Sequence, residues 1–289
     1  MLKERILSAI AMIIAVLAGI FLLSPLPFTL ILAAVITAAI WEWAQFAGFK
    51  RSLSRAIITF VTICLFILLI FANTHYIRAG RFLTDQTIPL LFISCCWWLI
   101  AFGLVISYPK SASLWSKSIT AKFIFGFCTL IPFFIAILAL RFNNYAFNQF
   151  QGAYLLLYVC LLVWCADSGA YFFGRAFGKR KLAAKVSPSK SWEGALGGLI
   201  TSCVMALLFI KLTPNNIFGR EFETLPFIIV SVATVAVSSL GDLAESMFKR
   251  QANIKDSSNL IPGHGGILDR IDSLTAAIPF FATLFFFVL

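Results

Sequence analysis

The residues best able to do chemistry cluster in the last third of the chain. Asp242, Glu245 and Lys249 recur at intervals of three and four residues, so in a helix they share one face. Asp269 and Asp272 repeat the same spacing further along. Carboxylate oxygens suit Mg²⁺, which proteins usually hold with one or two carboxylates plus the phosphates of a substrate. Two acidic helical faces that meet would therefore form a site for a metal and a phosphate-bearing substrate.

The same stretch supplies positive charge and flexible backbone. Lys249, Arg250, Lys255 and Arg270 can neutralise phosphate oxygens. The glycines in the sequence GHGG at 263–266 let backbone N–H groups approach an anion. A salt-bridged solvated loop is the alternative interpretation, but five of the 12 acidic residues of the chain fall in this stretch, which favours a functional site.

Two further clusters precede this one. Asp167 ends a long apolar run, and because a charge inside a bilayer is costly we expect it to face a protein interior or a water-filled cavity. The alternative is a position at the membrane surface, where the cost is small. In the segment 187–194, Ser189 or Ser191 can cap a helix that carries Glu193 in its first turn. Hydroxyls and Lys190 at a helix N-terminus suit an anion, although an ordinary capped helix would look the same.

The composition determines which elements can position these residues. Of the 289 residues, 61% are hydrophobic and 12% are charged, and the mean hydropathy is +0.94. These values exclude a soluble globular enzyme, a disordered chain and a secreted disulfide scaffold. The seven cysteines all lie in apolar runs and are expected to pack as small apolar residues. The sequence therefore predicts an all-α, polytopic integral membrane protein.

Long apolar runs predict about nine transmembrane helices. The expected spans are residues 6–23, 27–46, 56–73, 88–107, 121–140, 152–173, 194–212, 226–247 and 274–289. With this alternation, the Lys and Arg residues divide 18 to 5 in favour of the side that holds the N-terminus. Because basic residues favour the cytoplasmic side, the N-terminus is predicted to be cytoplasmic.

We also predict two regions, with five N-terminal spans in 1–150 and a catalytic region in 151–289. The polar connections 174–193 and 248–273 of the catalytic region then both face the cytoplasm. The basic residues are scattered between apolar stretches, so nucleic-acid binding is not expected.

A family resemblance becomes visible in the last cluster. The pattern Ser246-x-Phe248-Lys249-Arg250-x4-Lys255-Asp256-x-Ser258-x2-Ile261-Pro262-x-His264-Gly265-Gly266-Ile267-x-Asp269-Arg270-Ile271-Asp272 resembles the signature of the phosphatidate cytidylyltransferases, or CDP-diacylglycerol synthases. The segments 164–167 and 187–194 are also similar to that family. The resemblance covers about residues 160–275, and the short loops are similar to those of bacterial members.

The resemblance implies that CTP and phosphatidic acid give CDP-diacylglycerol and pyrophosphate at the inner membrane of a bacterium. It implies Mg²⁺ dependence, with a second cation nearby as an option, a lipid bilayer around the protein, and a homodimer. The ionised phosphate of the lipid would attack in line, so no enzyme nucleophile is needed.

The same resemblance suggests a role for each candidate residue. Asp242 and Asp269 would bind the metal, and Asp272, Asp167 or Glu245 would complete or orient the ligand set. Lys249, Arg250, Lys255 and Arg270 would stabilise the triphosphate. His264 would position a substrate rather than act as a base. The substrate site would further include Ser187, Lys190, Glu193, Gly265 and Gly266.

Three other functions remain open from the sequence. A cytidylyltransferase or kinase that acts on another lipid phosphate or on a polyprenol would use the same metal and anion site. A membrane transporter would also carry intramembrane acids, although no inverted repeat is visible. A CDP-alcohol phosphotransferase is a weaker alternative, because the acidic pattern of those enzymes is not found.

Overall fold

The computed structural model describes residues 2–49, 51–213, 218 and 222–289. Lys50 and Arg220, which enter the charge count, lie outside the described residues, as do the side chains of Lys3 and Arg5. The predicted cytoplasmic position of the N-terminus stays a prediction.

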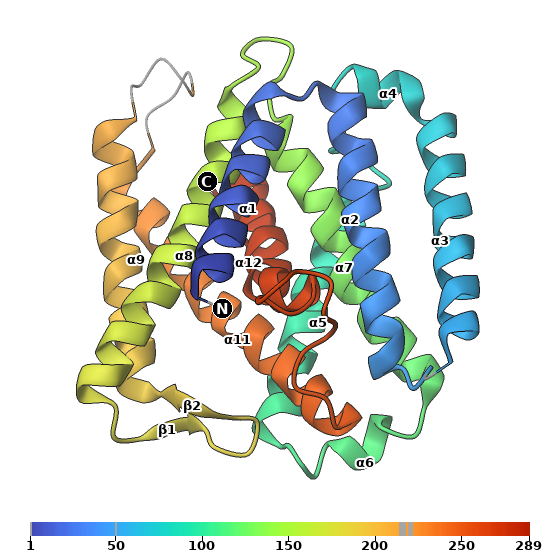
Figure 1. The fold of residues 1–289 in the computed structure, drawn as a ribbon. Helices are drawn as coiled ribbons and strands as arrows, with labels where there is room; N and C mark the ends of the chain where they lie inside the picture. The colour runs from blue at the N-terminus through green and yellow to red at the C-terminus, as the bar shows by residue number, and fades with distance from the viewer. Residues whose placement is uncertain (1, 50, 214–217, 219–221) are drawn as a thin grey trace.

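The described chain is a helical bundle (Figure 1). Within the described residues, eight helices are long and apolar enough to cross a membrane. They are α2 (Pro25–Phe46), α3 (Ser52–Ala72), α5 (Ile88–Ile106), α7 (Ile119–Arg141), α8 (Gln151–Phe177), α9 (Trp192–Leu212), α11 (Thr224–Ala252) and α12 (Leu268–Phe287). A ninth helix, α1 (Leu2–Leu22), has a shorter apolar stretch at Leu7–Leu22. The prediction of an all-α polytopic membrane protein is confirmed, and eight of the nine predicted spans correspond to candidate membrane-spanning helices among the described residues.

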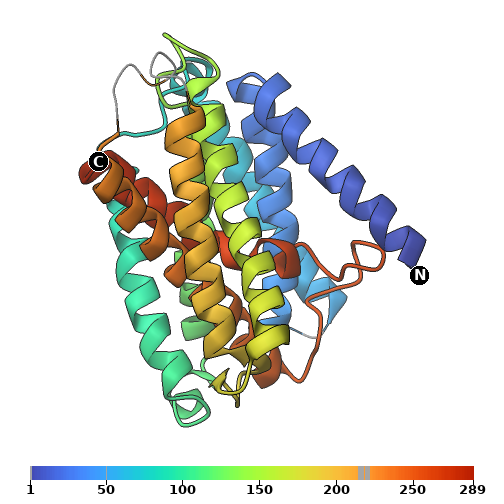
Figure 2. The same cartoon turned by 90° about the vertical axis from the view of Figure 1, so that its left-hand side faces the viewer.

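Three pairings matter for the site. Helices α8 and α9 run side by side at one edge of the bundle, and α2 and α3 lie together at another. Helices α11 and α12 pack against each other between these pairs. Seen from the side in Figure 2, α1 leans away from the other helices. Two short helices, α4 (Thr74–Arg78) and α6 (Ala112–Trp115), lie in the connections.

A β-hairpin joins α8 to α9. Its strands β1 (Lys181–Ala183) and β2 (Ser187–Ser191) are antiparallel, and Lys181 is paired with Ser191. The sequence predicts only a polar connection at 174–193. Strands of three and five residues are too short to show a hydrophobic period, so pattern reasoning could not find them. We call the side of the bundle that carries this hairpin the hairpin end.

The two helices that bear the acidic residues extend beyond their expected apolar cores. Helix α11 continues to Ala252, and α12 begins at Leu268 instead of at 274. The connection predicted at 248–273 is therefore shorter, and we call it the 253–267 loop. An apolar run marks only the membrane-embedded part of a helix, whereas the helix itself can continue into polar residues. An acidic first turn such as the one at Asp269 is favoured by the helix dipole.

Candidate active site

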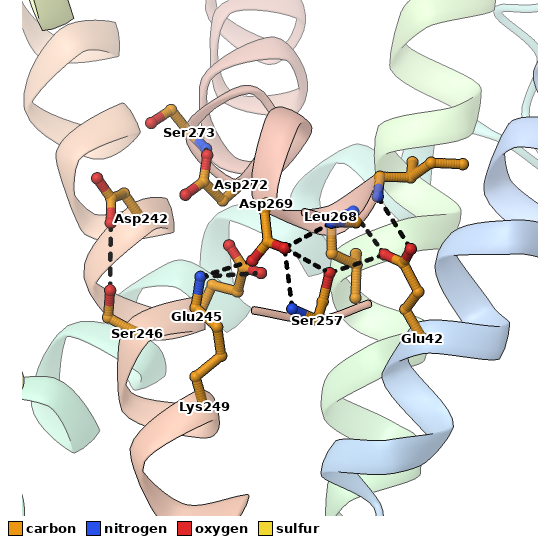
Figure 3. Close-up of polar contacts among 12 residues, drawn as sticks. Glu42, Asp242, Glu245, Ser246, Lys249, Ser257, Leu268, Asp269, Asp272 and Ser273 are labelled. Carbon is orange, nitrogen blue, oxygen red and sulfur yellow. Dashed lines mark hydrogen bonds and ion pairs between the residues drawn. The ribbon is translucent and has the colours of Figure 1, made fainter. Parts of the chain in front are cut away.

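The two acidic helical faces meet as predicted. Lys249 Nζ on α11 lies 2.8 Å from Asp269 Oδ1 on α12, and 3.5 Å from Glu245 Oε1 one turn earlier on its own helix (Figure 3). Gly241 allows α11 and α12 to approach each other closely here, because a Cβ atom at this position would lie 2.5 Å from the backbone oxygen of Asp272. Helical spacing and a small residue thus bring the carboxylates of both helices into one cluster.

Asp269 is held from several sides. Its Oδ2 atom accepts hydrogen bonds from the backbone N–H groups of Gly266, at 2.7 Å, and Ser257, at 2.9 Å. The hydroxyl of Ser257 lies 3.0 Å from the same oxygen, while Lys249 occupies Oδ1. The sequence predicts that the glycine amides of 263–266 bind a substrate anion. In the structure the Gly266 amide serves an internal carboxylate instead.

Glu42 on α2 is the residue that the sequence analysis missed. It is 1% exposed, and it accepts hydrogen bonds from the backbone N–H groups of Ile267 (2.9 Å) and Leu268 (2.8 Å). The hydroxyls of Ser257 and Ser258 donate to it at 2.9 and 2.6 Å. Glu42 therefore fixes the first turn of α12 and, through Ser257, the surroundings of Asp269 (Figure 3). The argument used for Asp167, an acid inside an apolar run, would also have singled out Glu42.

Gln45, one turn further along α2, reinforces this contact. Its Nε2 donates to the backbone oxygen of Ser257 at 2.7 Å. Gly266 packs so tightly here that a Cβ atom would lie 2.5 Å from Glu42 Oε1, and it would also contact the Ser257 hydroxyl. The 253–267 loop is thus clamped onto the N-terminal half of the protein.

Asp242 is paired with the hairpin. Its Oδ2 lies 2.7 Å from Lys190 Nζ on β2, and the Ser246 hydroxyl donates to Oδ1 at 3.3 Å. Asp167 on α8 lies within electrostatic range of both Lys190 and Asp242. Arg250, by contrast, points to the hairpin backbone, where its Nε donates to the Val186 oxygen at 3.3 Å. The predicted residues of the α8, hairpin and α11 segments therefore form one polar surface.

Two carboxylates have few protein donors. The side chain of buried Glu245 receives no hydrogen bond from a backbone N–H, hydroxyl or amide among the described residues; its neighbours are the Asp272 carboxyl group, with which it can share a proton, and the Lys249 ammonium at 3.5 Å. Asp272 accepts a 2.8 Å hydrogen bond from the N–H of Ser273. The Asp272 carboxyl group also lies within electrostatic range of the carboxyl groups of Glu245 and Asp242. Such an excess of buried negative charge fits a bound cation.

The side chains of the described residues indicate how a metal ion could be held. In the described part of the chain, no three carboxylate, imidazole or thiol side chains converge closely enough to hold a metal on their own. Mg²⁺ does not require such a cage, because substrate phosphates and water usually complete its shell. The residues present therefore fit a cation that is completed by a substrate.

The predicted residues of the hairpin have mainly structural contacts. Glu193 accepts hydrogen bonds from the backbone N–H groups of Lys179 (3.0 Å) and Arg180 (3.2 Å). Ser187 contacts only the Ser189 hydroxyl, at 3.4 Å, among its side-chain hydrogen bonds to described residues. Ser191 is the N-cap of α9 and accepts from the Gly194 N–H at 3.1 Å, so one of the two predicted caps is the observed one.

Replacing Ser191 by alanine tests this cap. We expect a loss of about 1 kcal/mol in the free energy of unfolding, because the Gly194 N–H loses its acceptor. The measurement is thermal unfolding in detergent. Ser189→Ala is the matched control, since Ser189 is exposed and does not cap the helix. Equal stability of the two variants would contradict the capping role.

A second polar cavity lies over the 253–267 loop. It has a volume of about 550 Å³ and is lined by Lys255, Asp256, His264, Gly265 and Arg270, among others. His264 Nδ1 is 2.8 Å from the Ser8 hydroxyl of α1. Gly265 lies between this cavity and the carboxylate cluster, because a Cβ atom there would lie 2.6 Å from Asp269 Oδ2. The predicted phosphate-binding residues therefore divide into two groups, on either side of Asp269.

Comparison with known proteins identifies the family. The sequence profile described as the cytidylyltransferase family matches residues 3–288. The chain belongs to the cytidylyltransferase family. Among its cytidylyltransferase relatives, a protein of Haemophilus influenzae named phosphatidate cytidylyltransferase is 56% identical over 290 residues and covers 100% of both chains. Proteins with the same name are 41% identical in Pseudomonas aeruginosa, with 98% of this chain and 97% of the relative covered, and 32% identical in Bacillus subtilis, with 96% of each covered. The sequence resemblance to cytidylyltransferases, noted above for residues 160–275, thus covers residues 3–288 of this chain.

Proposed function

We propose that the protein transfers CMP from CTP to phosphatidic acid, with CDP-diacylglycerol and pyrophosphate as products. The observation that carries the proposal is the carboxylate cluster of α11 and α12, flanked by Lys190 and Lys249, in a chain whose full-length relatives bear the name of this activity. The comparisons do not favour a kinase or a transporter. The reaction needs positioning and charge neutralisation more than covalent chemistry from the protein, and the cluster offers both.

Each residue of the cluster has a proposed role. Asp242, which is partly exposed beside the hairpin, and Asp272, which has a single backbone donor, are the proposed inner ligands of Mg²⁺, while Asp269 holds its place beside them through the 253–267 loop. When bound, Mg²⁺ would polarise the α-phosphate and offset the charge of the triphosphate. Lys190 and Lys249 hold the triphosphate from the hairpin and from α11. Glu245 supplies negative charge that keeps the Lys249 ammonium in place.

The candidate spans and the relatives also indicate in which membrane the protein lies. We propose a bacterial inner membrane, supported by the eight candidate spans and by the bacterial sources of the relatives. The hairpin end would face the cytoplasm, where CTP is present, and the excess of Lys and Arg on the predicted cytoplasmic side supports this orientation. The homodimer remains a proposal that rests on the family resemblance.

The direct test is incorporation of radiolabelled CTP into lipid by the purified protein, with phosphatidic acid and Mg²⁺ present. We expect labelled CDP-diacylglycerol and one pyrophosphate for each lipid formed. Release of a nucleoside diphosphate in place of pyrophosphate would instead indicate a kinase. Transport of a solute in proteoliposomes without any lipid product would support the transporter alternative.

Replacing Lys190 by methionine tests the nucleotide side of the site. The change keeps the length of the side chain but removes the ammonium beside Asp242, and a lost charged hydrogen bond costs about 1.5–3 kcal/mol. We therefore expect kcat/KM for CTP to fall about 10- to 100-fold. Lys185→Met is the control, because Lys185 is an exposed residue of the hairpin turn. An unchanged kcat/KM for CTP in Lys190→Met would contradict the assignment.

A further inference from the structure

A long apolar groove runs between α2 and α3. Its volume is about 760 Å³, and its walls include Leu30, Ala34, Ala38, Ile63, Phe66 and Ile67. On α2 it extends from Leu30 to Glu42, which corresponds to about 18 Å at 1.5 Å per residue. One leaflet of a bilayer has a hydrocarbon depth of about 15 Å, half of the usual 30 Å core. The groove is therefore about as long as one leaflet is deep.

The groove ends at polar groups of the 253–267 loop. Ser258, Asn259 and Leu260 line its end together with Glu42. Asn259 also lines the 550 Å³ polar cavity that holds Lys255, His264 and Arg270, so the two cavities adjoin at this residue.

The polar cavity carries charge that suits an anion. Lys255 and Arg270 are exposed, and neither makes an ion pair with another described residue. Asp256 is the acidic residue that also lines this cavity. An apolar groove of leaflet length that opens into a basic cavity matches the shape and the charge of an anionic phospholipid.

We propose that these adjoining cavities bind the phosphatidic acid substrate, with one acyl chain in the α2–α3 groove and the phosphate at Lys255, Arg270 and His264. This inference rests on the proposed function and adds the position of the lipid. Gly265 separates the cavity from Asp269, so the lipid phosphate arrives beside the carboxylate cluster. CTP then approaches from the opposite side, where Lys190 and Asp242 lie. Helices α2 and α3 of the N-terminal half thus hold the acyl chain, and the 253–267 loop and the start of α12 hold the phosphate.

The first test narrows the groove. Ala38→Trp places an indole in the groove, and Ala72→Trp is the control, because Ala72 is an exposed residue of α3 that does not line the groove. KM and kcat are measured with dioleoyl and with dihexanoyl phosphatidic acid. We expect Ala38→Trp to raise KM for the dioleoyl lipid about tenfold and to leave the dihexanoyl lipid within about twofold. An equal effect on both lipids, or no effect on either, would overturn the proposal.

The second test does not depend on how a variant folds. Wild-type protein in vesicles is photolabelled with phosphatidic acid that carries a diazirine in its acyl chain. Label on residues 30–42, competed by unlabelled phosphatidic acid but not by phosphatidylcholine, supports the proposal. Label elsewhere, or equal competition by phosphatidylcholine, overturns it. A labelled protein that makes no CDP-diacylglycerol would refute the proposed function alone, whereas active protein without this label would refute the lipid site alone.

Discussion

Replacing Asp242 by asparagine is expected to lower turnover of CTP and phosphatidic acid by a factor of about a hundred or more, in line with the loss of one preorganised electrostatic group from an active site. Asparagine keeps the volume of the side chain but removes the charge that a cation requires and that pairs with Lys190 at 2.7 Å. The half-saturating concentration of Mg²⁺ should rise as well. Since 30% of the Asp242 side chain is exposed, thermal unfolding should change little.

The measurements are steady-state turnover at several Mg²⁺ concentrations and thermal unfolding of the purified variant. Asp85→Asn is the control, because Asp85 is an exposed acid far along the chain from the carboxylate cluster. Near wild-type turnover with an unchanged Mg²⁺ dependence would remove Asp242 from the proposed metal site. A large loss of stability would instead indicate a structural role.

Replacing Glu42 by alanine should have the largest effect on stability. The variant leaves the N–H groups of Ile267 and Leu268 without an acceptor in a buried position. At about 1–3 kcal/mol for each unpaired group, we expect the free energy of unfolding to fall by about 2–6 kcal/mol. Activity should fall too, because Ser257 loses one of the groups that fix it beside Asp269.

The Glu42→Gln variant distinguishes a role of Glu42 in positioning Asp269 from its role in stabilising the fold. Its side chain still offers one acceptor oxygen, so we expect a smaller loss of stability than in Glu42→Ala. We expect a clear fall in kcat with little change in KM for CTP, since Glu42 and Asp242, the partner of Lys190, lie on opposite sides of Asp269 (Figure 3). Glu223→Ala is the control, because Glu223 is exposed and forms no side-chain cap at α11. Wild-type kcat in a stable Glu42→Gln protein would exclude a positioning role.

The sequence was informative where the signal is local. Intervals of three and four residues placed Asp242, Glu245 and Lys249 on one face of α11, and the structure confirms that this face meets the start of α12. Long apolar runs likewise predicted the spans, because each bilayer crossing requires its own stretch of apolar side chains.

Other features depend on contacts between distant segments, which no local pattern reports. Glu42 lies 215 residues before Ser257, and only the fold brings them together. The donors around Asp269 come from a loop whose path is set by that contact. The β-hairpin could not be predicted because its strands are very short, yet it places Lys190 beside Asp242. The predicted roles of the site residues, including the metal ligands, stay predictions.

The contact of Glu42 with Ile267 and Leu268 also dictates when the site comes into being. Ile267 and Leu268 follow Glu42 by 225 and 226 residues, so in a growing chain the Glu42 carboxylate lacks these partners until residues 267 and 268 have been made. A nascent chain that stops before α12 therefore lacks Asp269 and Asp272 and cannot form the carboxylate cluster. The carboxylate cluster therefore forms only after α12 has been made and has packed against α11 and α2.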